Sequence, residues 1–225
     1  MIDKFVRSAA EALADVKDGS VVLIAGFGAV GQPKALIEAL AEQGAKDLTV
    51  VTNNAGFGQG GLVRLMEYGR VRKLICSFPS LGSTLFEELY KAGRIELEII
   101  PQGTLAEKIR AAGAGVPAFF TPTGAGTLLT KGKEVREYGG RPCVLETALF
   151  ADVALIEAWQ ADRWGNLTYR KSGRNFNPIM ATAGKLTVVQ TQHIVADPGI
   201  DPETVITPGI FVDKVVHIPY GDPDI

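Results

Sequence analysis

The sequence has few of the residues that build disulfide frameworks and metal sites. Its 225 residues include two cysteines and two histidines. The cysteines, Cys76 and Cys143, lie far apart in sequence and beside neither histidine, so no disulfide pattern or metal-ligand spacing can be formed from them. We therefore expect no metal site and a reducing, cytoplasmic environment.

An excess of charge of one sign and a long apolar run are also lacking. The 23 basic and 25 acidic residues give a formal net charge of −2, which predicts binding neither to nucleic acid nor to an anionic membrane. No apolar stretch is long enough to span a bilayer. The segment from Ile2 has the pattern of an amphipathic helix rather than that of a signal peptide. Together these absences predict a soluble globular protein.

What the sequence does contain is an alternation of short apolar strands and amphipathic helices. Hydrophobic residues make up 46% of the chain, enough for a substantial core. After a helix expected at 2–16, the pattern predicts strands at 21–25, 48–52, 73–78 and 96–100 and helices at 33–43, 61–68, 84–92 and 105–112. This order predicts an α/β fold: a doubly wound, mainly parallel sheet with helices on both faces.

From about Gly113 glycines and prolines interrupt this pattern. We expect a loop-rich β-hairpin insertion here, with strands at 134–138 and 143–145. The sheet then resumes, with strands at 153–158, 167–170 and 186–190 and a helix near 178–183. Because neither an internal repeat nor a flexible linker divides the chain, residues 1–225 are expected to form a single domain.

The most informative motif joins the first predicted strand of the sheet to its helix. Residues 25–33 read Ala-Gly-Phe-Gly-Ala-Val-Gly-Gln-Pro. Gly26, Gly28 and Gly31 have the spacing G-x-G-x-x-G, which lets backbone approach an anion at a helix N-terminus. We expect a phosphate-bearing cofactor here, with a purely structural turn as the alternative. A dinucleotide-binding dehydrogenase is disfavoured, because the next strand ends in two asparagines instead of the acidic residue that binds ribose.

Amide side chains follow two further strands of the predicted sheet. Asn53 and Asn54 follow the second strand and Gln102 follows the fourth, with Thr104 expected as the N-cap of the next helix. The carboxyl ends of parallel strands meet at one edge, so these amides should lie near the glycine loop. Neutral amides can stabilise a carboxylate or a developing oxyanion without titrating. The alternatives are an asparagine turn and a solvated loop amide.

Other polar residues are weaker candidates. His193 and His217 are isolated, and Glu146 is a candidate nucleophile for which pairing with a nearby arginine is the favoured interpretation. A solvated face explains one basic cluster as well as contact with a partner or an anion does; the cluster comprises Arg163, Arg170, Lys171 and Arg174, next to Asn175 and Asn177. No Ser/His/Asp or metal constellation is found, so the chain alone lacks a convincing catalytic group.

Five segments together resemble the α subunits of family I coenzyme A transferases of the 3-oxoacid or 3-oxoadipate type. They are GFGAVGQP at 26–33, TNNAG at 52–56, PQGTLAE at 101–107, GAGVPAFFTPTG at 113–124 and DRWGNLTYR at 162–170. The family usually opens its glycine loop with two glycines, whereas Ala25 stands first here. Since alanine needs a negative φ, the strand should remain regular up to Gly26.

The resemblance implies an enzyme divided between two chains, with an α2β2 assembly and the nucleophilic glutamate on a β subunit. CoA would pass from succinyl-CoA to a 3-oxo acid, 3-oxoadipate or acetoacetate, by a ping-pong mechanism through a glutamyl-CoA intermediate. The CoA thioester would be a substrate, and no permanently bound cofactor is implied.

The resemblance also assigns roles to residues. Ala25, Gly26, Phe27, Gly28, Ala29, Val30 and Gly31 would form the CoA-binding loop. Asn53 and Asn54 would contact the acyl substrate, and Gln102 would donate to the carboxylate or oxyanion. Two alternatives remain: a non-catalytic CoA-binding regulatory domain, and a sugar-phosphate isomerase of the same architecture, for which the sequence shows neither a base nor a phosphate clamp.

Overall fold

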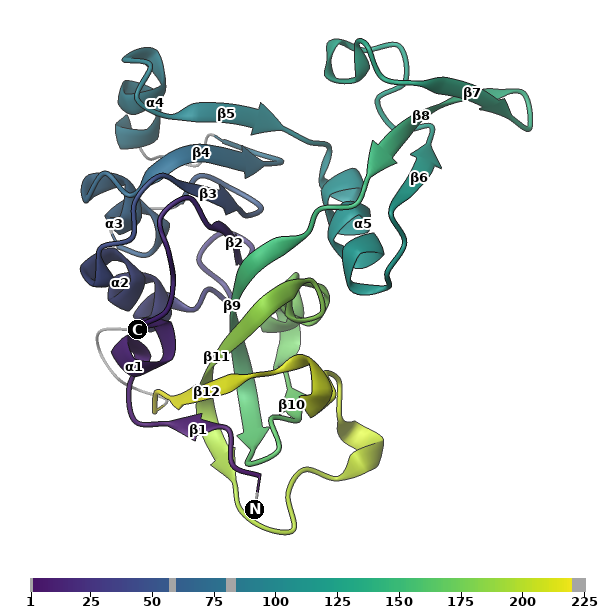
Figure 1. Ribbon diagram of the computed structural model, residues 1–225. Helices are drawn as coiled ribbons and strands as arrows, with labels where there is room; N and C mark the ends of the chain where they lie inside the picture. The colour runs from purple at the N-terminus through teal and green to yellow at the C-terminus, as the bar shows by residue number, and fades with distance from the viewer. Residues whose placement is uncertain (1, 57–59, 80–83, 220–225) are drawn as a thin grey trace.

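A nine-stranded sheet forms the centre of the protein (Figure 1). The computed structural model describes residues 2–56, 60–79 and 84–219. Along the sheet the strands lie in the order β1 (Phe5–Val6), β12 (Lys214–His217), β11 (Gly184–Val195), β9 (Ala151–Asp162), β2 (Val21–Ile24), β3 (Leu48–Val51), β4 (Val71–Cys76) and β5 (Glu96–Ile99). Every neighbouring pair on this path is parallel. The mainly parallel α/β sheet is therefore confirmed.

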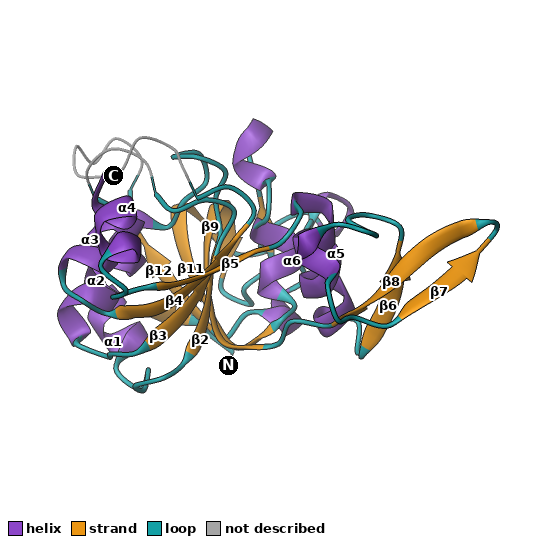
Figure 2. Ribbon diagram, turned by 90° about the horizontal axis from the view of Figure 1, so that it is seen from above, coloured by secondary structure: helices purple, strands orange, loops and turns teal. Residues whose placement is uncertain are grey.

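Helices cover both faces of this sheet, as Figure 2 shows. One face packs against α1 (Ala9–Leu13), α2 (Lys34–Gln43), α3 (Leu62–Glu67) and α4 (Thr84–Lys91), and the other against α5 (Gln102–Gly113) and α6 (Asn177–Ala181). Alternate residues of β2 serve the two cores: Val22 and Ile24 face the first, and Leu23 faces the second. A strand buried on both sides needs an unbroken apolar run, which β2 has.

The winding of the sheet changes direction between β2 and β9. From β2 the chain adds β3, β4 and β5 on one side, and from β9 it adds β11 and β12 on the other. Ligands of open parallel sheets bind beyond the carboxyl ends of the strands at such a switch point. The glycine loop follows β2 directly, so the topology places it at this point.

A second sheet stands away from the first (Figures 1 and 2). It contains β6 (Ala118–Thr121), β8 (Arg141–Thr147) and β7 (Val135–Tyr138) in that order, and both pairings are antiparallel. The expected hairpin corresponds to β7 and β8. β6 was not expected, because it lies among the glycines and prolines that predicted a loop.

The N-terminal segment differs from its prediction. Instead of one helix over 2–16, β1 comes first, and its Phe5 pairs in parallel register with Val215 of β12. The helix begins only after Ser8, whose hydroxyl accepts a hydrogen bond from the N–H of Glu11 at 3.1 Å. Two-residue strands carry too little pattern to be told from a helical stripe.

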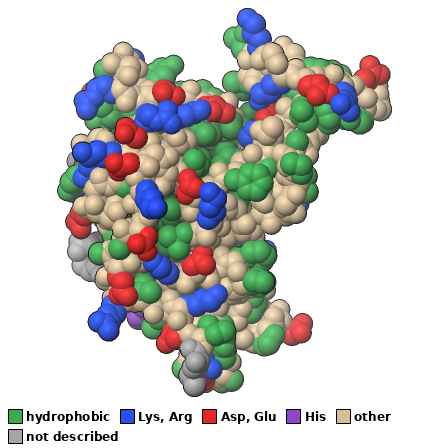
Figure 3. Space-filling view, viewed as in Figure 1, with side chains coloured by type: hydrophobic (Ala, Val, Ile, Leu, Met, Phe, Trp, Pro, Cys, Tyr) green, Lys and Arg blue, Asp and Glu red, His purple; other side chains and the backbone are tan. Residues whose placement is uncertain are grey.

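The remaining elements are short. β10 (Leu167–Thr168) pairs antiparallel with β9, and 3-10 turns lie at Leu128–Thr130, Lys171–Arg174, Pro202–Thr204 and Gly209–Phe211. On the face shown in Figure 3, acidic and basic side chains lie among one another, as the balanced composition predicts. Within the described ranges, no helix combines the length and apolarity needed to cross a membrane.

Candidate active site

The glycine loop folds into a tight reverse turn at the carboxyl edge of the sheet. The N–H of Phe27 donates to the carbonyl of Val30 at 3.0 Å, and the N–H of Val30 donates back at 3.2 Å. Gly26, Gly28 and Gly31 have φ of +123°, +62° and +65°, which other residues adopt only with strain. The side chains at 27 and 30 are 53% and 48% exposed, so the turn presents an apolar tip.

The helix after this turn begins one residue later than predicted. Pro33 is the N-cap of α2, not its first helical residue. The N–H of Ala35 donates to Oε1 of Gln190 on β11 at 3.0 Å. One of the N-terminal donors that a bound anion would use is therefore already satisfied by the protein itself.

The structure brings together two of the predicted strand-end amides. Nε2 of Gln102 donates to Oδ1 of Asn53 at 2.7 Å, and the hydroxyl of Ser77 donates to the same oxygen at 2.7 Å. Asn53 is buried, whereas Gln102 is exposed as the first residue of α5. The pair thus combines a fixed partner with an accessible amide at the positive end of a helix dipole, where negative charge is stabilised.

Asn54 and Thr104 differ from that pair. Oδ1 of Asn54 accepts the N–H of Gly56 at 3.0 Å, which is the asparagine turn considered from the sequence. The expectation that Thr104 caps α5 was wrong, because the helix begins at Gln102 with Pro101 as its N-cap. Thr104 is instead buried within the first turn, and its hydroxyl has no partner among the described residues.

A pocket of about 420 Å³ lies at the switch point, beside the glycine loop. Val30 and Gly31 of the loop form one wall, and the segment 169–173 forms another. Glu157 and Trp159 of β9 also line it. The pocket therefore lies between the loop that follows β2 and the middle of β9.

Charge in this pocket is arranged around one carboxyl group. Burial raises the pKa of Glu157 above its ordinary value, although the hydrogen bond from Gln192 at 2.5 Å and the charge of Lys34 oppose the rise. The Arg170 guanidinium lies 4.6 Å from the centre of the Trp159 ring. These groups give the pocket an aromatic wall with a basic rim.

The predicted basic cluster is divided by the fold. Arg170 and Lys171 line the pocket, whereas Arg163 pairs with Asp197 at 2.9 Å. Its two asparagines have a role that sequence reasoning missed: Nδ2 of Asn175 donates to the carbonyl of Val30 at 3.0 Å, and Asn177 bonds the next residue of the glycine loop. Only the presence of neutral amides among the basic residues could have signalled this.

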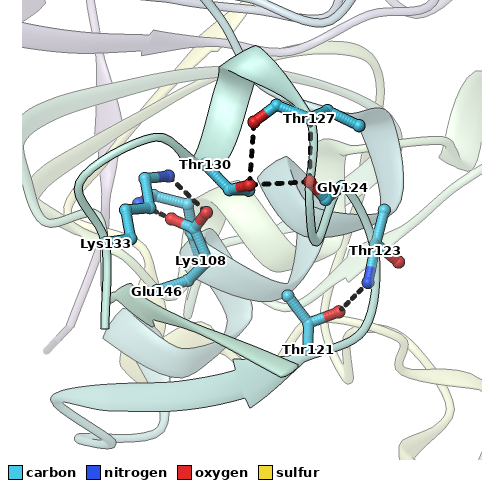
Figure 4. A network of polar contacts seen from close by, with 8 residues as sticks. All are labelled: Lys108, Thr121, Thr123, Gly124, Thr127, Thr130, Lys133 and Glu146. Atoms are coloured by element: carbon cyan, nitrogen blue, oxygen red, sulfur yellow. Dashed lines mark hydrogen bonds and ion pairs between the residues drawn. The ribbon is translucent and has the colours of Figure 1, made fainter. Parts of the chain in front are cut away.

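Glu146 lies in a buried polar network of the second sheet (Figure 4). It pairs with lysines, not with the arginine predicted: Nζ of Lys108 lies 2.9 Å from Oε2, and Lys133 donates to Oε1. Burial opposes ionisation of this carboxyl, but the two lysine hydrogen bonds outweigh it and hold the pKa below its ordinary value. A carboxylate bonded on both oxygens and only 4% exposed is a structural ion pair.

The histidines and cysteines lie in strands. His193 meets the Trp159 ring edge-on, with centroids 4.1 Å apart, and His217 is exposed on β12. Cys76 and Cys143 are both buried, and burial raises the pKa of Cys76 to about 11. Over the described ranges, no group of three or more His, Cys, Asp or Glu side chains is placed to hold a metal ion.

The sequence is similar to known transferase chains along nearly its whole length. The family model described as coenzyme A transferase matches residues 6–217. The chain is 55% identical over 219 residues to the A subunit of 3-oxoadipate CoA-transferase from Pseudomonas putida, covering 97% of this chain and 95% of the relative. It is 46% identical over 213 residues to the A subunit of a probable succinyl-CoA:3-ketoacid coenzyme A transferase from Bacillus subtilis, covering 95% and 89%.

Solved structures share the fold. Glutaconate coenzyme A-transferase of Acidaminococcus fermentans gives a TM-score of 0.83 at 25% identity, covering 96% of this chain and 76% of that one. An acyl-CoA transferase of E. coli O157:H7, solved as a thioester complex with CoA, gives 0.82 at 24% identity; the match covers 97% of this chain but only 49% of that longer one. Sequence and fold agree, and the chain belongs to the coenzyme A transferase family.

Proposed function

We propose that this chain is the α subunit of a two-chain cytoplasmic transferase that moves CoA from succinyl-CoA to a 3-oxo acid, 3-oxoadipate or acetoacetate. Relatives 55% and 46% identical are named as the A subunits of a 3-oxoadipate CoA-transferase and of a probable succinyl-CoA:3-ketoacid coenzyme A transferase. Residues 1–225 would act as one domain that completes its site with a β subunit. The observation that carries the proposal is the Asn53–Gln102 amide pair at the ligand-binding edge of the sheet.

The nucleophile is proposed to come from the β subunit. Among the described residues, the two buried carboxylates, Glu146 and Asp162, are both engaged. The partly buried Glu157 of the pocket accepts a hydrogen bond from Gln192. Glu146 is held by two lysines. Asp162 accepts hydrogen bonds from the N–H groups of Trp164, Asn166 and Ile200. A partner glutamate opposite the amide pair would supply the missing group, as the family resemblance implies.

The reaction divides into two half-reactions. The partner glutamate attacks the thioester carbonyl, and CoA thiolate leaves to give an acyl-glutamyl anhydride. The thiolate then attacks the glutamyl carbonyl, which releases succinate and leaves a glutamyl-CoA thioester. The acceptor acid repeats these steps in reverse. Each attack develops negative charge on a carbonyl oxygen, where the amide of Gln102 can donate without a proton transfer.

The glycine loop is proposed to contact CoA near its reactive end. Its exposed side chains, Phe27 and Val30, are apolar, which suits the alkyl segments of the pantetheine arm better than the phosphates. Gly28, at the tip of the turn, has no side chain and open space where a Cβ would stand, so a ligand can approach the main chain closely there. Asn53 and Asn54 would contact the acyl group from the neighbouring strand end.

The test is reconstitution with the β chain. Succinate-dependent CoA exchange is expected from the mixture and from neither chain alone, with parallel-line ping-pong kinetics. Trapping the intermediate with acyl-CoA should label a β-chain glutamate, which mass spectrometry would locate. Activity of this chain alone would contradict the divided site and direct attention back to Glu146. CoA binding without turnover by the pair would favour a regulatory domain.

A further inference from the structure

We propose that Asn175 and Asn177 are positioning residues, an asparagine clamp that fixes the glycine loop in the shape that receives CoA. Asn175 lies between β10 and α6, and Asn177 is the first residue of α6. Both are about 145 residues from the loop in sequence. The inference rests on the proposed function, because the loop's contact with CoA is itself proposed. The bonds that form the clamp are independent of that assignment.

Asn177 joins three parts of the molecule with one side chain. Its Nδ2 donates to the carbonyl of Gly31 at 3.1 Å and to that of Gly173 at 2.8 Å. Its Oδ1 accepts the N–H of Glu157 on β9 at 2.7 Å. The side chain is fully buried, so each of these bonds replaces a water contact that is no longer accessible.

Asn175 holds the neighbouring residue of the loop. Its Nδ2 donates to the carbonyl of Val30 at 3.0 Å and to that of Ser172 at 3.0 Å. The same Val30 carbonyl accepts the N–H of Phe27 that closes the turn. Oδ1 of Asn175 accepts the N–H of Phe176 at 2.6 Å, which orients the amide. The clamp thus bonds directly to the atoms that define the turn.

The contact is too close for any side chain on the loop at this point. A Cβ at Gly31 would lie 2.6 Å from Nδ2 of Asn175 and 2.6 Å from the carbonyl oxygen of Gly173. At Gly28, on the tip, a Cβ would meet nothing within 4 Å. The loop is therefore held at its base and open at its tip, as a preorganised binding loop should be.

The hydrophobic core does not fix the conformation of the glycine loop. Both large side chains of the turn are about half exposed, so little apolar burial fixes its conformation. A segment with few buried contacts opens locally unless polar bonds hold it. The clamp supplies such bonds from the opposite side of the switch point, and it ties the loop to the β9 backbone that lines the pocket.

The experiment uses the assembled α and β chains. Asn177→Asp keeps the acceptor for Glu157 but removes both donors, and Asn175→Ala removes the bond to Val30 at a partly exposed site. The control is Asn166→Ala: this amide joins Asp162 to the N–H of Gly209 and touches no atom of the loop. Amide exchange at Phe27 and Val30 is measured together with kcat/KM for succinyl-CoA and for the acceptor acid.

Both clamp variants should accelerate amide exchange in the turn and lower kcat/KM for succinyl-CoA by about tenfold, the effect of roughly one hydrogen bond. The value for the acceptor acid should change less than about threefold, because CoA is then already attached to the enzyme. The control should lose thermal stability without separating the two values. Rescue by Asn177→Gln is not expected, because the longer side chain cannot fit the buried site.

Normal exchange and kinetics in both variants would overturn the clamp. So would an equal loss of both kcat/KM values, which a merely structural role produces. If Asn177→Asp does not fold, Asn175→Ala decides the question alone. If the wild-type pair transfers no CoA, the proposed function fails, and the exchange measurement still tests whether the asparagines hold the loop.

Discussion

Two sets of amide side chains lie at the same edge of the sheet and are used differently. At the ends of β3 and β5, Gln102 donates to Asn53, and amide bonds to amide. Across the switch point, Asn175 and Asn177 donate to backbone carbonyls of the glycine loop. In the first set the amide of Gln102 remains exposed to solvent, whereas in the second the amides bond to backbone atoms of the protein.

This difference separates a side chain that is accessible to a ligand from side chains that support the fold. Gln102 is exposed and bonded to one side chain, so a ligand can compete for its donors at little cost to the fold. Asn177 is buried and bonded to three backbone groups, so its loss should reach the ligand only through the loop. Residue type alone does not distinguish the two roles, but burial and the identity of the bonded atoms do.

The largest effect expected is that of Gln102→Ala on turnover. If the amide stabilises the oxyanion, kcat should fall about 10²- to 10³-fold, equivalent to about 3 kcal/mol. The free energy of unfolding should change by less than about 0.5 kcal/mol, because the side chain is exposed. Steady-state kinetics and urea unfolding check the two halves. Ser77→Ala, which removes only a support of Asn53, is the control. Equal losses of kcat in both variants would mean that Gln102 acts only by holding Asn53.

Alanine substitutions at Gly28 and Gly31 should show how rigidly the asparagine clamp holds the base of the loop. Gly28 and Gly31 have nearly the same φ, +62° and +65°, so backbone strain should cost about 1 to 2 kcal/mol at each. Only at Gly31 would a Cβ collide with the clamp, which adds about 1 to 3 kcal/mol. Urea unfolding should therefore show Gly31→Ala to be clearly less stable than Gly28→Ala. Equal stabilities would mean that the clamp yields.

Glu146→Gln tests whether a buried charged group stabilises the fold through its bonds, as the buried amide of Asn177 does. Glu146→Gln should lower the free energy of unfolding by about 1 to 2 kcal/mol, because the buried Lys108 and the partly exposed Lys133 lose their shared anion. The exposed pair of Glu134 and Arg136 gives the control Glu134→Gln, expected to cost about 0.5 kcal/mol or less. Because the folded pKa of Glu146 is lowered, its contribution is present above the unfolded pKa of about 4.3 and is lost as pH falls below it. Unfolding curves of wild type and variant should converge on acidification.

The smallest effect is expected for Glu157→Gln, at the carboxyl group beside the clamp. Burial raises its folded pKa, so its contribution to stability is full below the unfolded pKa of about 4.3 and is lost as pH rises through the folded value. The variant should therefore gain on wild type by about 1 kcal/mol or less between pH 4 and pH 8. Urea unfolding across that range checks the sign. If the variant instead lost stability relative to wild type as pH rises, the assigned shift of the Glu157 pKa would be contradicted.

The sequence predicted that Asn53 and Gln102 lie at one edge of the sheet, although not that they bond to each other, because this placement depends only on where each strand ends. Strand periodicity placed Asn53 and Gln102 after two parallel strands, and parallel strands end at one edge. The same reasoning recovered β2 to β5 and the helices between them with boundaries within about two residues. Nothing in this reasoning requires knowledge of distant contacts.

The clamp could not be predicted in that way. Asn175 meets Val30 across a sequence separation of 145 residues, and the neighbouring arginines suggested a surface patch. β1 and β12 were missed for a related reason: Phe5 pairs with Val215, and neither short segment shows a period of its own. Where a residue's role depends on backbone carbonyls brought close by the fold, the pattern of side chains does not identify its partners.

The burial of the two cysteines has a consequence for a protein that handles a thiol as cargo. Mixed disulfides form when an accessible thiolate attacks a disulfide sulfur. Cys76 and Cys143 are both buried, and a thiol with a pKa of about 11 is almost wholly protonated at neutral pH. Neither cysteine of this chain is therefore placed to form a mixed disulfide with oxidised CoA while the chain is folded.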